Sequence, residues 1–177
     1  MNAESMRVFF ALWPDAAVKA ELDAAAGKLH ELRGGRRTQP DTLHLTLVFI
    51  GEIAVNRLPE LFEAAEGITV PKFEVLFDQA DCWRHNHVAH LAASQTPTAL
   101  LELVKQLEAR LDTAAIPFDR RPYVPHITLL RKADCLPQME NPALAPIRWL
   151  ARDFVLVRSS LRSGGALYEQ MGRWPLL

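Results

Sequence analysis

The chain has 177 residues, of which 49% are hydrophobic and 23% are charged, and its formal net charge is −1 at pH 7. This length predicts one domain or two small lobes sharing a core, large enough to fold without a stabilising metal or disulfide. A nearly neutral chain is not suited to coating nucleic acid by bulk charge. Any contact with RNA must therefore come from local arginine clusters and a shaped site.

The two cysteines and the first apolar run bear on the cellular compartment. Cys82 and Cys135 form no Cys-x-x-Cys pair, and we interpret both as reduced thiols of a cytosolic protein. The first apolar run, over residues 8–13, ends at Pro14 and is too short for a signal segment or a membrane span. These features predict a cytoplasmic protein without membrane contact.

In the first half of the chain, apolar runs bounded by turn residues indicate strands, and apolar residues at helical spacing indicate helices. The predicted elements, in chain order, are a strand over 7–13, a helix begun by Asp15 and ended by Gly34 and Gly35, a strand over 43–50, a short helix capped by Asn56 and a strand over 72–80.

The second half carries the clearest helical pattern, which Thr96 opens as the N-cap and Pro97 as the first helical residue. The predicted elements are a strand over 87–93, this helix with Leu100, Val104, Leu107 and Leu111 on its apolar face, a strand over 123–131, a proline-rich loop over 137–146 and strands over 148–161 and 166–174.

The order strand, helix, strand occurs twice, over 7–50 and again over 87–131. Each copy ends on a strand that contains His-x-Thr, and the two histidines, His44 and His126, are 82 residues apart. Duplicated halves of this kind often pack about a pseudo-twofold axis. We therefore predict a single α+β domain over 1–177, with antiparallel sheets and helices on the outer faces.

The two motifs are His44-Leu-Thr-Leu and His126-Ile-Thr-Leu. Side chains alternate between the faces of a strand, so His44 and Thr46 point to one face while their apolar neighbours point to the other. His126 and Thr128 repeat this arrangement. A lone motif is more typical of a satisfied core histidine, but a pair at equivalent places of a repeat favours function.

Two histidines and two threonines suit the hydrolysis of a cyclic phosphodiester. Histidine titrates near neutral pH, so one imidazole can accept a proton from water while the other gives a proton to the departing ribose oxygen. In-line attack needs these groups on opposite sides of phosphorus, as two strands facing across a cleft provide. The hydroxyls of Thr46 and Thr128 can stabilise the non-bridging oxygens, and a strained cyclic phosphate does not require a metal.

The sequence resembles the two-histidine phosphoesterase superfamily, and within it the RNA 2',3'-cyclic phosphodiesterases, historically called 2'-5' RNA ligases. The similarity runs almost from end to end. It includes the opening segment 7–12, both His-x-Thr-x motifs with their flanks over 43–52 and 121–131, and the late Ser159-Ser-Leu stretch.

This resemblance implies a bilobal fold of two antiparallel sheets around a central cleft. It also implies hydrolysis of RNA 2',3'-cyclic phosphate ends to 2'-phosphate ends without a cofactor, with reversal as 2'-5' ligation. It implies His44 as the proton donor to the leaving 3'-oxygen and His126 as the proton acceptor from water. Arg131 matches an arginine of this group that contacts phosphate.

Other residues are candidates with a structural alternative. Phe10 and Tyr123 could stack on a base, although Phe10 also fits a plain core position. A positive rim that steers RNA, or an ordinary solvated surface, is predicted for Arg33, Arg36, Arg37, Arg120, Arg121, Arg131 and Lys132.

The histidines of segment 85–90 could form a metal cluster, but we favour an edge strand with exposed histidines, and we predict no metal site. Unlike the resembling family, which usually has Trp at that place of the strand, this chain has His90. Thr38 stands where many members carry an aromatic residue.

Three other functions remain open. The chain could act on small cyclic nucleotides or on 2'-5' linkages, it could be a non-catalytic RNA- or nucleotide-binding module, or it could be a metal-binding protein. An RNA end is the only partner predicted, and no obligate protein partner is expected.

Overall fold

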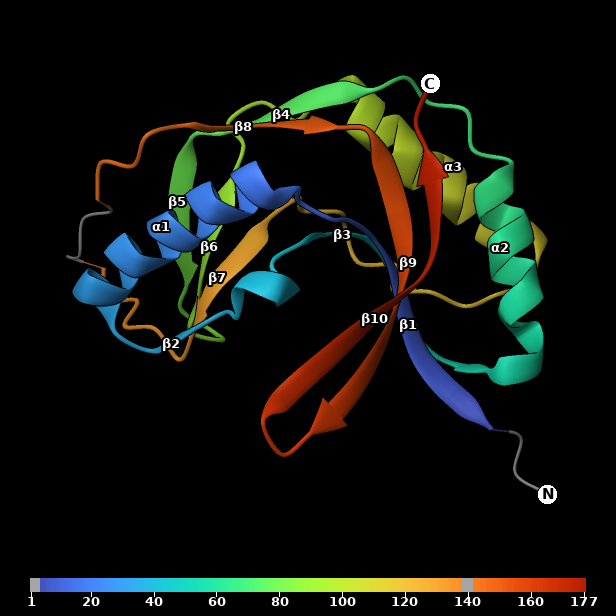
Figure 1. Cartoon of the computed structure of the whole chain (residues 1–177), viewed down its shortest axis with the longest axis horizontal. Coiled ribbons are helices and arrows are strands. Elements are labelled where there is room, and N and C mark those ends of the chain that lie inside the picture. The colour runs from blue at the N-terminus through green and yellow to red at the C-terminus, as the bar shows by residue number, and fades with distance from the viewer. Residues whose placement is uncertain (1–3, 138–141) are drawn as a thin grey trace.

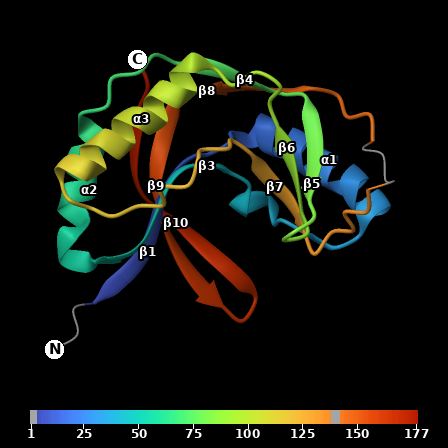
Figure 2. The same ribbon diagram turned by 180° about the vertical axis from the view of Figure 1, so that it is seen from behind.

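The structure is a computed structural model that describes residues 4–137 and 142–177. It has two lobes, each built on a four-stranded sheet, with the strand orders β10-β9-β1-β3 and β2-β7-β6-β5. A third, two-stranded sheet of β4 and β8 runs from one lobe to the other (Figures 1 and 2). All strand pairs are antiparallel, so the prediction of an α+β fold with two antiparallel sheets is confirmed.

The first lobe is built around β1, whose backbone pairs with β3 on one side and β9 on the other. The helices α2 and α3 contact each other, and α3 packs against β3. The elements of this lobe are β1 (Ser5–Leu12), β3 (Leu45–Ala54), a 3-10 turn η2 (Val55–Arg57), α2 (Leu58–Glu66), α3 (Thr98–Thr113), β9 (Asp153–Arg162) and β10 (Gly165–Pro175).

The second lobe carries α1, which packs against β7 and β8. Its elements are α1 (Ala16–Arg33), β2 (Arg36–Arg37), a 3-10 turn η1 (Pro40–Thr42), β5 (Gln79–Trp83), β6 (Val88–Ala92) and β7 (Ile127–Arg131). Asp15 caps α1 as predicted, because its carboxylate accepts from the Val18 N–H at 2.9 Å.

Gly35 lets the short strand β2 lie against the end of β7. Its φ is +80°, and a Cβ at this position would lie 2.6 Å from the carbonyl oxygen of Arg131. A larger residue would push β2 away from the strand that carries the second motif.

The bridging strands β4 (Phe73–Phe77) and β8 (Ile147–Ala151) are arranged symmetrically. Phe73 pairs with Ala151 and Phe77 with Ile147, so Val75 and Trp149 face each other at the centre of the pair. The strand that follows β4 belongs to one lobe and the strand that follows β8 belongs to the other. The predicted pseudo-twofold axis therefore passes through this pair.

The two halves of the repeat exchange strands. The strand β5 of the first half pairs with β6 of the second, and β9 of the second half pairs with β1 of the first. The helices are exchanged in the same sense, because α1 packs against β7 and α3 against β3. Each lobe thus contains elements of both halves.

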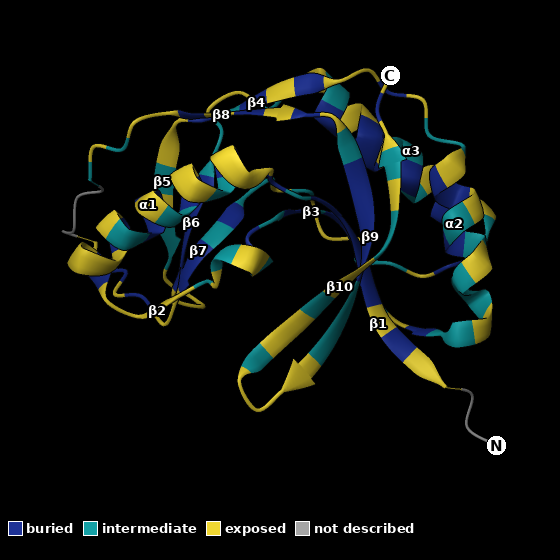
Figure 3. Ribbon diagram, viewed as in Figure 1, coloured by how far each residue is buried: buried dark blue, intermediate teal, exposed yellow. Residues whose placement is uncertain are grey.

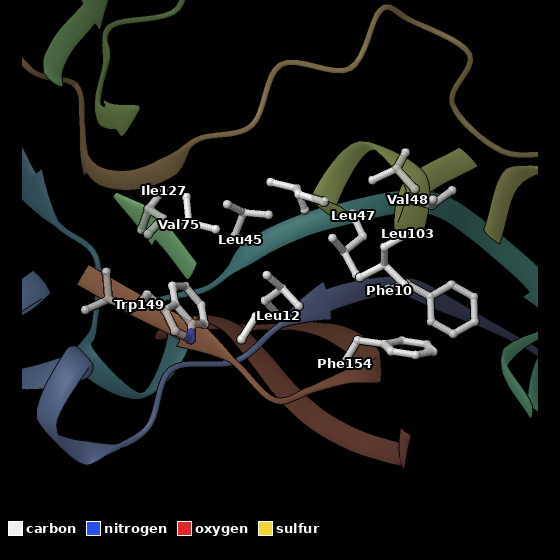
Figure 4. Close-up of a cluster of buried hydrophobic side chains, with 14 of the residues drawn as sticks. Phe10, Leu12, Leu45, Leu47, Val48, Val75, Leu103, Ile127, Trp149 and Phe154 are labelled. Carbon is white, nitrogen blue, oxygen red and sulfur yellow. The ribbon is translucent and has the colours of Figure 1, made fainter. Parts of the chain in front are cut away.

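One large hydrophobic cluster includes residues of both lobes and of the bridging strands. Figure 4 shows its centre, where Val75, Trp149 and Ile127 lie on one side and Phe10, Phe154 and Leu103 on the other. Burial alternates with exposure along the bridging strands β4 and β8. The hairpin of β9 and β10 is buried at the start of β9 and projects from the first lobe with an exposed tip (Figure 3).

Two predicted strands are each divided in the structure. The segment predicted over 72–80 forms β4 and β5, and the one over 148–161 lies in β8 and β9. The chain passes from the bridging sheet into a lobe sheet at Asp78 and again at Arg152. A pattern of apolar residues does not reveal such a change of partner, because apolar residues continue on both sides of the change.

Some predicted ends also differ. The helix α2 is preceded by the turn η2, so Asn56 is not its N-cap. No side chain caps α3, whose N-cap is Pro97 rather than Thr96. The strand β7 begins only at Ile127, because Pro125 cannot donate to a strand partner. Of the predicted proline-rich loop, residues 138–141 lie outside the described residues.

The two cysteines are not the reduced thiols that the sequence predicted. Cys82 on β5 and Cys135, beyond the end of β7, are joined in a disulfide with a Cα–Cα distance of 5.5 Å. The interpretation of both as reduced thiols is therefore wrong for this structure. A separation of 53 residues gives no local signal of the pairing, which depends on the β5-β6-β7 sheet. None of the described helices is long and apolar enough to cross a membrane.

Candidate active site

The first motif lies at the start of β3. Leu45 and Leu47 are buried in the core at 0% and 2% exposure, whereas His44 and Thr46 are only partly buried and line a cleft between the lobes. The alternation predicted from the sequence is therefore present. It arises because the strand packs its apolar face on the core and leaves the polar face to the cleft.

The second motif has the same arrangement on the opposite lobe. Ile127 and Leu129 are fully buried, and His126 and Thr128 face the same cleft as the first motif. The cleft has a volume of about 560 Å³. The structure thus brings together two histidines and two threonines that are about half a chain apart in the sequence.

The imidazole of His44 is fixed by two hydrogen bonds. Its Nδ1 lies 2.7 Å from the carbonyl oxygen of Thr42, and its Nε2 lies 3.1 Å from the hydroxyl oxygen of Thr46. Since a carbonyl can only accept, Nδ1 carries the proton. In the neutral ring, Nε2 is then an acceptor from the Thr46 hydroxyl and points into the site.

Three aromatic rings surround His44. The Trp13 ring is stacked on it at a centroid distance of 5.3 Å and an angle of 6°, and Phe9 and Tyr168 lie at 5.0 and 5.4 Å. Burial lowers the pKa of His44 to about 4, against the opposing effect of the Thr42 carbonyl, and the charges of His126 and Arg131 lower it further. The ring is therefore neutral at pH 7 in the empty cleft.

His126 is held in a similar way. Its Nδ1 lies 2.8 Å from the carbonyl oxygen of Val124, two residues before it, which matches the spacing of Thr42 and His44. Burial lowers the pKa of His126, the Val124 carbonyl opposes this, and Arg131 lowers it again. The proton on Nδ1 leaves Nε2 as an unprotonated acceptor suited to a general base.

The cleft is strongly positive although the chain is nearly neutral. Four arginines and no aspartate or glutamate occur among the described residues that line it: Arg7, Arg36, Arg37 and Arg131. Arg131 follows the second motif on β7 and lowers the pKa of both histidines. It is therefore close enough to interact electrostatically with an anion held between them.

Only part of the predicted arginine rim lines the cleft. Arg33 is buried and donates to the carbonyl of Asp134, while Arg120 and Arg121 pair with Asp112 and Asp119. None of these three, nor Lys132, is among the residues of the cleft wall. The prediction of a positive rim is thus limited to the β2 arginines and Arg131.

Phe10 and Tyr123, the two candidates for stacking on a base, lie away from the cleft. Phe10 is fully buried in the core, with its ring 6.1 Å from those of Phe154 and Trp174 (Figure 4). Tyr123 donates to the carbonyl oxygen of Thr46 at 3.1 Å, and its burial raises the pKa of its hydroxyl. Neither lines the cleft. The core position given as the alternative for Phe10 is therefore confirmed, and Tyr123 links the chain before β7 to β3 rather than facing the cleft.

The aromatic residues that do face the cleft were missed. Phe9, next to Phe10 in the sequence, lines the cleft together with Phe49 and Tyr168. Both faces of the strand over 7–13 are apolar, so alternation could not identify which phenylalanine points outward. Trp13 and Tyr168 are distant in sequence from His44 and could be assigned to it only from the fold.

The three histidines of segment 85–90 occupy different parts of the β5–β6 hairpin. His85 and His87 are exposed in the turn, whereas His90 is 3% exposed on β6. The prediction of exposed histidines is therefore wrong for His90. In the described parts of the chain, no group of three or more His, Cys, Asp or Glu is placed to hold a metal ion.

Comparison with protein families agrees with this architecture. The model of the LigT like Phosphoesterase family matches the chain twice, over residues 12–90 and 91–168. Each match contains one His-x-Thr motif, and the boundary between the matches falls within the strand predicted over 87–93, which opens the second copy of the repeat.

Comparison with individual proteins gives relatives of similar length. The chain is 30% identical over 176 residues to the "RNA 2',3'-cyclic phosphodiesterase" of Escherichia coli, covering 98% of each chain. It is also 30% identical over 186 residues to the protein of the same description from Thermus thermophilus, covering 97% of this chain and 90% of the relative.

Solved structures extend the similarity to the fold. Escherichia coli LigT complexed with 3'-AMP matches with a TM-score of 0.87 and 31% identity, covering 98% of this chain and 99% of the other. The resemblance suggested by the two motifs is confirmed, and the chain belongs to the LigT-like phosphoesterase family.

Proposed function

We propose that this protein hydrolyses RNA 2',3'-cyclic phosphate ends to 2'-phosphate ends, with His44 as the proton donor and His126 as the proton acceptor. The observation that carries the proposal is the meeting of the two His-x-Thr motifs in one positive cleft. The descriptions of the Escherichia coli and Thermus thermophilus relatives support the same substrate.

The reaction can be written with these side chains alone. Neutral His126 takes a proton from water as the water oxygen attacks phosphorus. Protonated His44 gives its proton to the ribose 3'-oxygen as the bond between this oxygen and phosphorus breaks. The hydroxyls of Thr46 and Thr128, with Arg131, stabilise the charge on the non-bridging oxygens. The product is a 2'-phosphate, and no covalent enzyme intermediate forms.

The donor role requires His44 to gain a proton, because the pKa of its ring is lowered to about 4 in the empty cleft. A phosphodiester anion beside the ring favours the imidazolium and raises this pKa. We therefore expect the substrate to bind together with a proton. Calorimetric titration with a phosphate-type product in two buffers of different ionisation enthalpy measures this uptake.

Each of the two histidines should be needed for turnover. We expect His44→Ala and His126→Ala each to lower kcat by about 10²–10⁴-fold, since each removes one proton transfer. The assay measures hydrolysis of a nucleoside 2',3'-cyclic phosphate in the presence and in the absence of EDTA. The isomer of the product is identified in each case. His30→Ala, at an exposed position of α1 outside the cleft, is the control.

Several outcomes would contradict the proposal. Turnover that survives both substitutions would exclude the paired histidines, and a 3'-phosphate product would exclude His44 as the donor to the 3'-oxygen. Loss of activity in EDTA would indicate a metal. A panel that includes small cyclic nucleotides and 2'-5' linkages separates the proposed substrate from related ones.

Cytoplasmic localisation is part of the same proposal and is supported by the presence of RNA in that compartment. The Cys82–Cys135 disulfide is unusual for the cytosol, where thiols are kept reduced. Alkylation of free thiols in intact cells, followed by mass spectrometry of both cysteines, tests the compartment and the bond together.

A further inference from the structure

A buried third histidine lies beside the second motif. His90 is 3% exposed on β6, and in the β6–β7 ladder it stands directly opposite Thr128. Residues directly opposite in an antiparallel pair project to the same face, so His90 projects to the side that also carries Thr128 and His126. It is not among the residues that line the cleft.

Three rings form a cluster around His126. The Trp83 ring lies 4.0 Å from that of His90 and 4.5 Å from that of His126, and His90 lies 5.7 Å from His126. The Trp83 and His126 rings meet at 69° and the two imidazoles at 77°. These edge-to-face contacts restrict the orientation of the His126 ring, and neither Trp83 nor His90 is among the residues that line the cleft.

A single hydrogen bond does not fix an imidazole completely. The hydrogen bond from Nδ1 of His126 to the Val124 carbonyl places the proton on Nδ1. It leaves the ring free to rotate about that contact. His44 has a second hydrogen bond to Thr46 and three surrounding aromatic rings. At His126 the packing against Trp83 and His90 is the corresponding restraint.

We propose that His90 is a positioning residue for His126, and that with Trp83 it forms a two-ring wall that orients this imidazole and excludes water from its buried side. The inference rests on the proposed function, in which His126 accepts a proton from water. His90 acts through His126 and does not touch the substrate.

The charges around the wall are consistent with a neutral His90. Burial lowers the pKa of His90, the Val88 carbonyl opposes this, and His126 lowers it again, while Asp81 on β5 raises it. The other titratable or charged groups facing the cluster are Arg131 on β7, His44 across the cleft and His85 in the turn. Burial is also the largest cause that lowers the pKa of His126.

Removing the His90 ring should change both the pKa of His126 and the rate of turnover. In His90→Ala, water reaches the buried side of His126, so the pKa of His126 rises toward its ordinary value. We expect kcat at pH 7 to fall about tenfold with KM within about twofold, and the acid limb of kcat/KM to move up by about half a pH unit or more. In His90→Phe, the ring remains, and we expect near wild-type kcat and an unshifted acid limb.

Proton NMR titration of His126 in the ligand-free protein gives an independent readout. Its midpoint should rise in His90→Ala and in Trp83→Leu and should not move in His90→Phe. His85→Ala is the matched control, because this exposed imidazole also lies against Trp83, at 6.2 Å, but in the hairpin turn. Thermal unfolding identifies any variant that fails to fold, in which case Trp83→Leu and His90→Phe decide the test.

Two outcomes would overturn the inference: an unchanged His126 titration and kcat in both His90→Ala and Trp83→Leu, or a His90→Phe protein as impaired as His90→Ala. Failure of the proposed function is distinguishable. A wild-type protein that does not open a cyclic phosphate would remove the catalytic role, while the NMR titration would still report whether the wall controls His126.

Discussion

The imidazole of His44 has two opposing requirements. Its enclosure by Trp13, Phe9 and Tyr168 keeps the ring neutral in the empty cleft, whereas donation to a leaving oxygen requires the charged form. The hydroxyl of Thr46, 3.1 Å from Nε2, can satisfy the neutral ring until an anion arrives. The low pKa is therefore a property of the unoccupied site that a bound phosphate reverses.

The lowered pKa of His44 predicts a dependence of stability on pH. The unfolded chain binds a proton at this residue near pH 6.5, whereas the folded protein does so only near pH 4. Stability attributable to neutral His44 is therefore fully present above pH 6.5 and is lost as the pH falls toward 4. At about 1.4 kcal/mol per pKa unit, the loss amounts to about 3 kcal/mol at most.

Urea unfolding of the wild type and of His44→Asn, at neutral pH and near pH 4.5, isolates this effect. We expect the wild type to lose more free energy of unfolding than the variant over the same interval. Other buried histidines titrate in both proteins and cancel in the comparison. An equal loss in the two proteins would mean that His44 is not buried in the neutral form.

At the scale of elements, the β5-β6-β7 sheet supports the second motif and is closed by a covalent bond. Cys82 on β5 precedes Trp83, which packs against His126, and Cys135 follows the end of β7. The Cys135 sulfur also lies 3.6 Å from the carbonyl oxygen of Trp83. The disulfide thus joins β5, which carries Trp83, to the segment after the second motif.

A disulfide that spans 53 residues should stabilise the protein by about 4 kcal/mol through the entropy of the unfolded chain. We expect reductant, or the double substitution Cys82→Ser with Cys135→Ser, to lower the free energy of unfolding by that order. The double variant should not respond to reductant, which provides the control. Two free thiols per chain in unreduced, unfolded protein would contradict the bond.

The sequence predicted the features that depend on one segment and missed those that depend on contacts between distant segments. Local patterns identified α1 with its Asp15 cap and the two His-x-Thr strands, because these depend on capping chemistry and alternation within one segment. The site residues that came from contacts between distant strands, such as Trp13 and Tyr168 around His44, left no local signal. Phe10 and Phe9 differ only in the face of one strand, and an apolar run on both faces does not distinguish them.

On the scale of the whole molecule, positive charge is concentrated in the cleft of a nearly neutral chain. Arg36 and Arg131 line it, and Arg37 does so while pairing with Asp23 at 2.6 Å. No aspartate or glutamate of the described chain is among the residues that line the cleft. The field of the cleft therefore attracts a polyanion locally even though the net charge of −1 does not.

We expect Arg36→Gln to raise KM for an RNA substrate severalfold at low salt and to make KM less dependent on salt, because exposed charges act within a screening length of about 10 Å. Arg120→Gln removes the same charge from an exposed residue outside the cleft and is the matched control. Steady-state kinetics at several ionic strengths measures both. An equal change in the two variants would indicate a general charge effect rather than a local one.

The exchange of strands between the two halves supports the proposal that residues 1–177 form one two-lobed domain. It has a further consequence for any ancestor that contained one half alone. A chain made of the first half alone would lack the strand that pairs with β1 as β9 does and the helix that packs against β3. A second identical copy is the molecule that could supply both. The symmetric pairing of β4 with β8 around Val75 and Trp149 is the contact such a homodimer would make. In this ancestor, catalysis would have required dimerisation, because each copy would bring one histidine to the shared cleft.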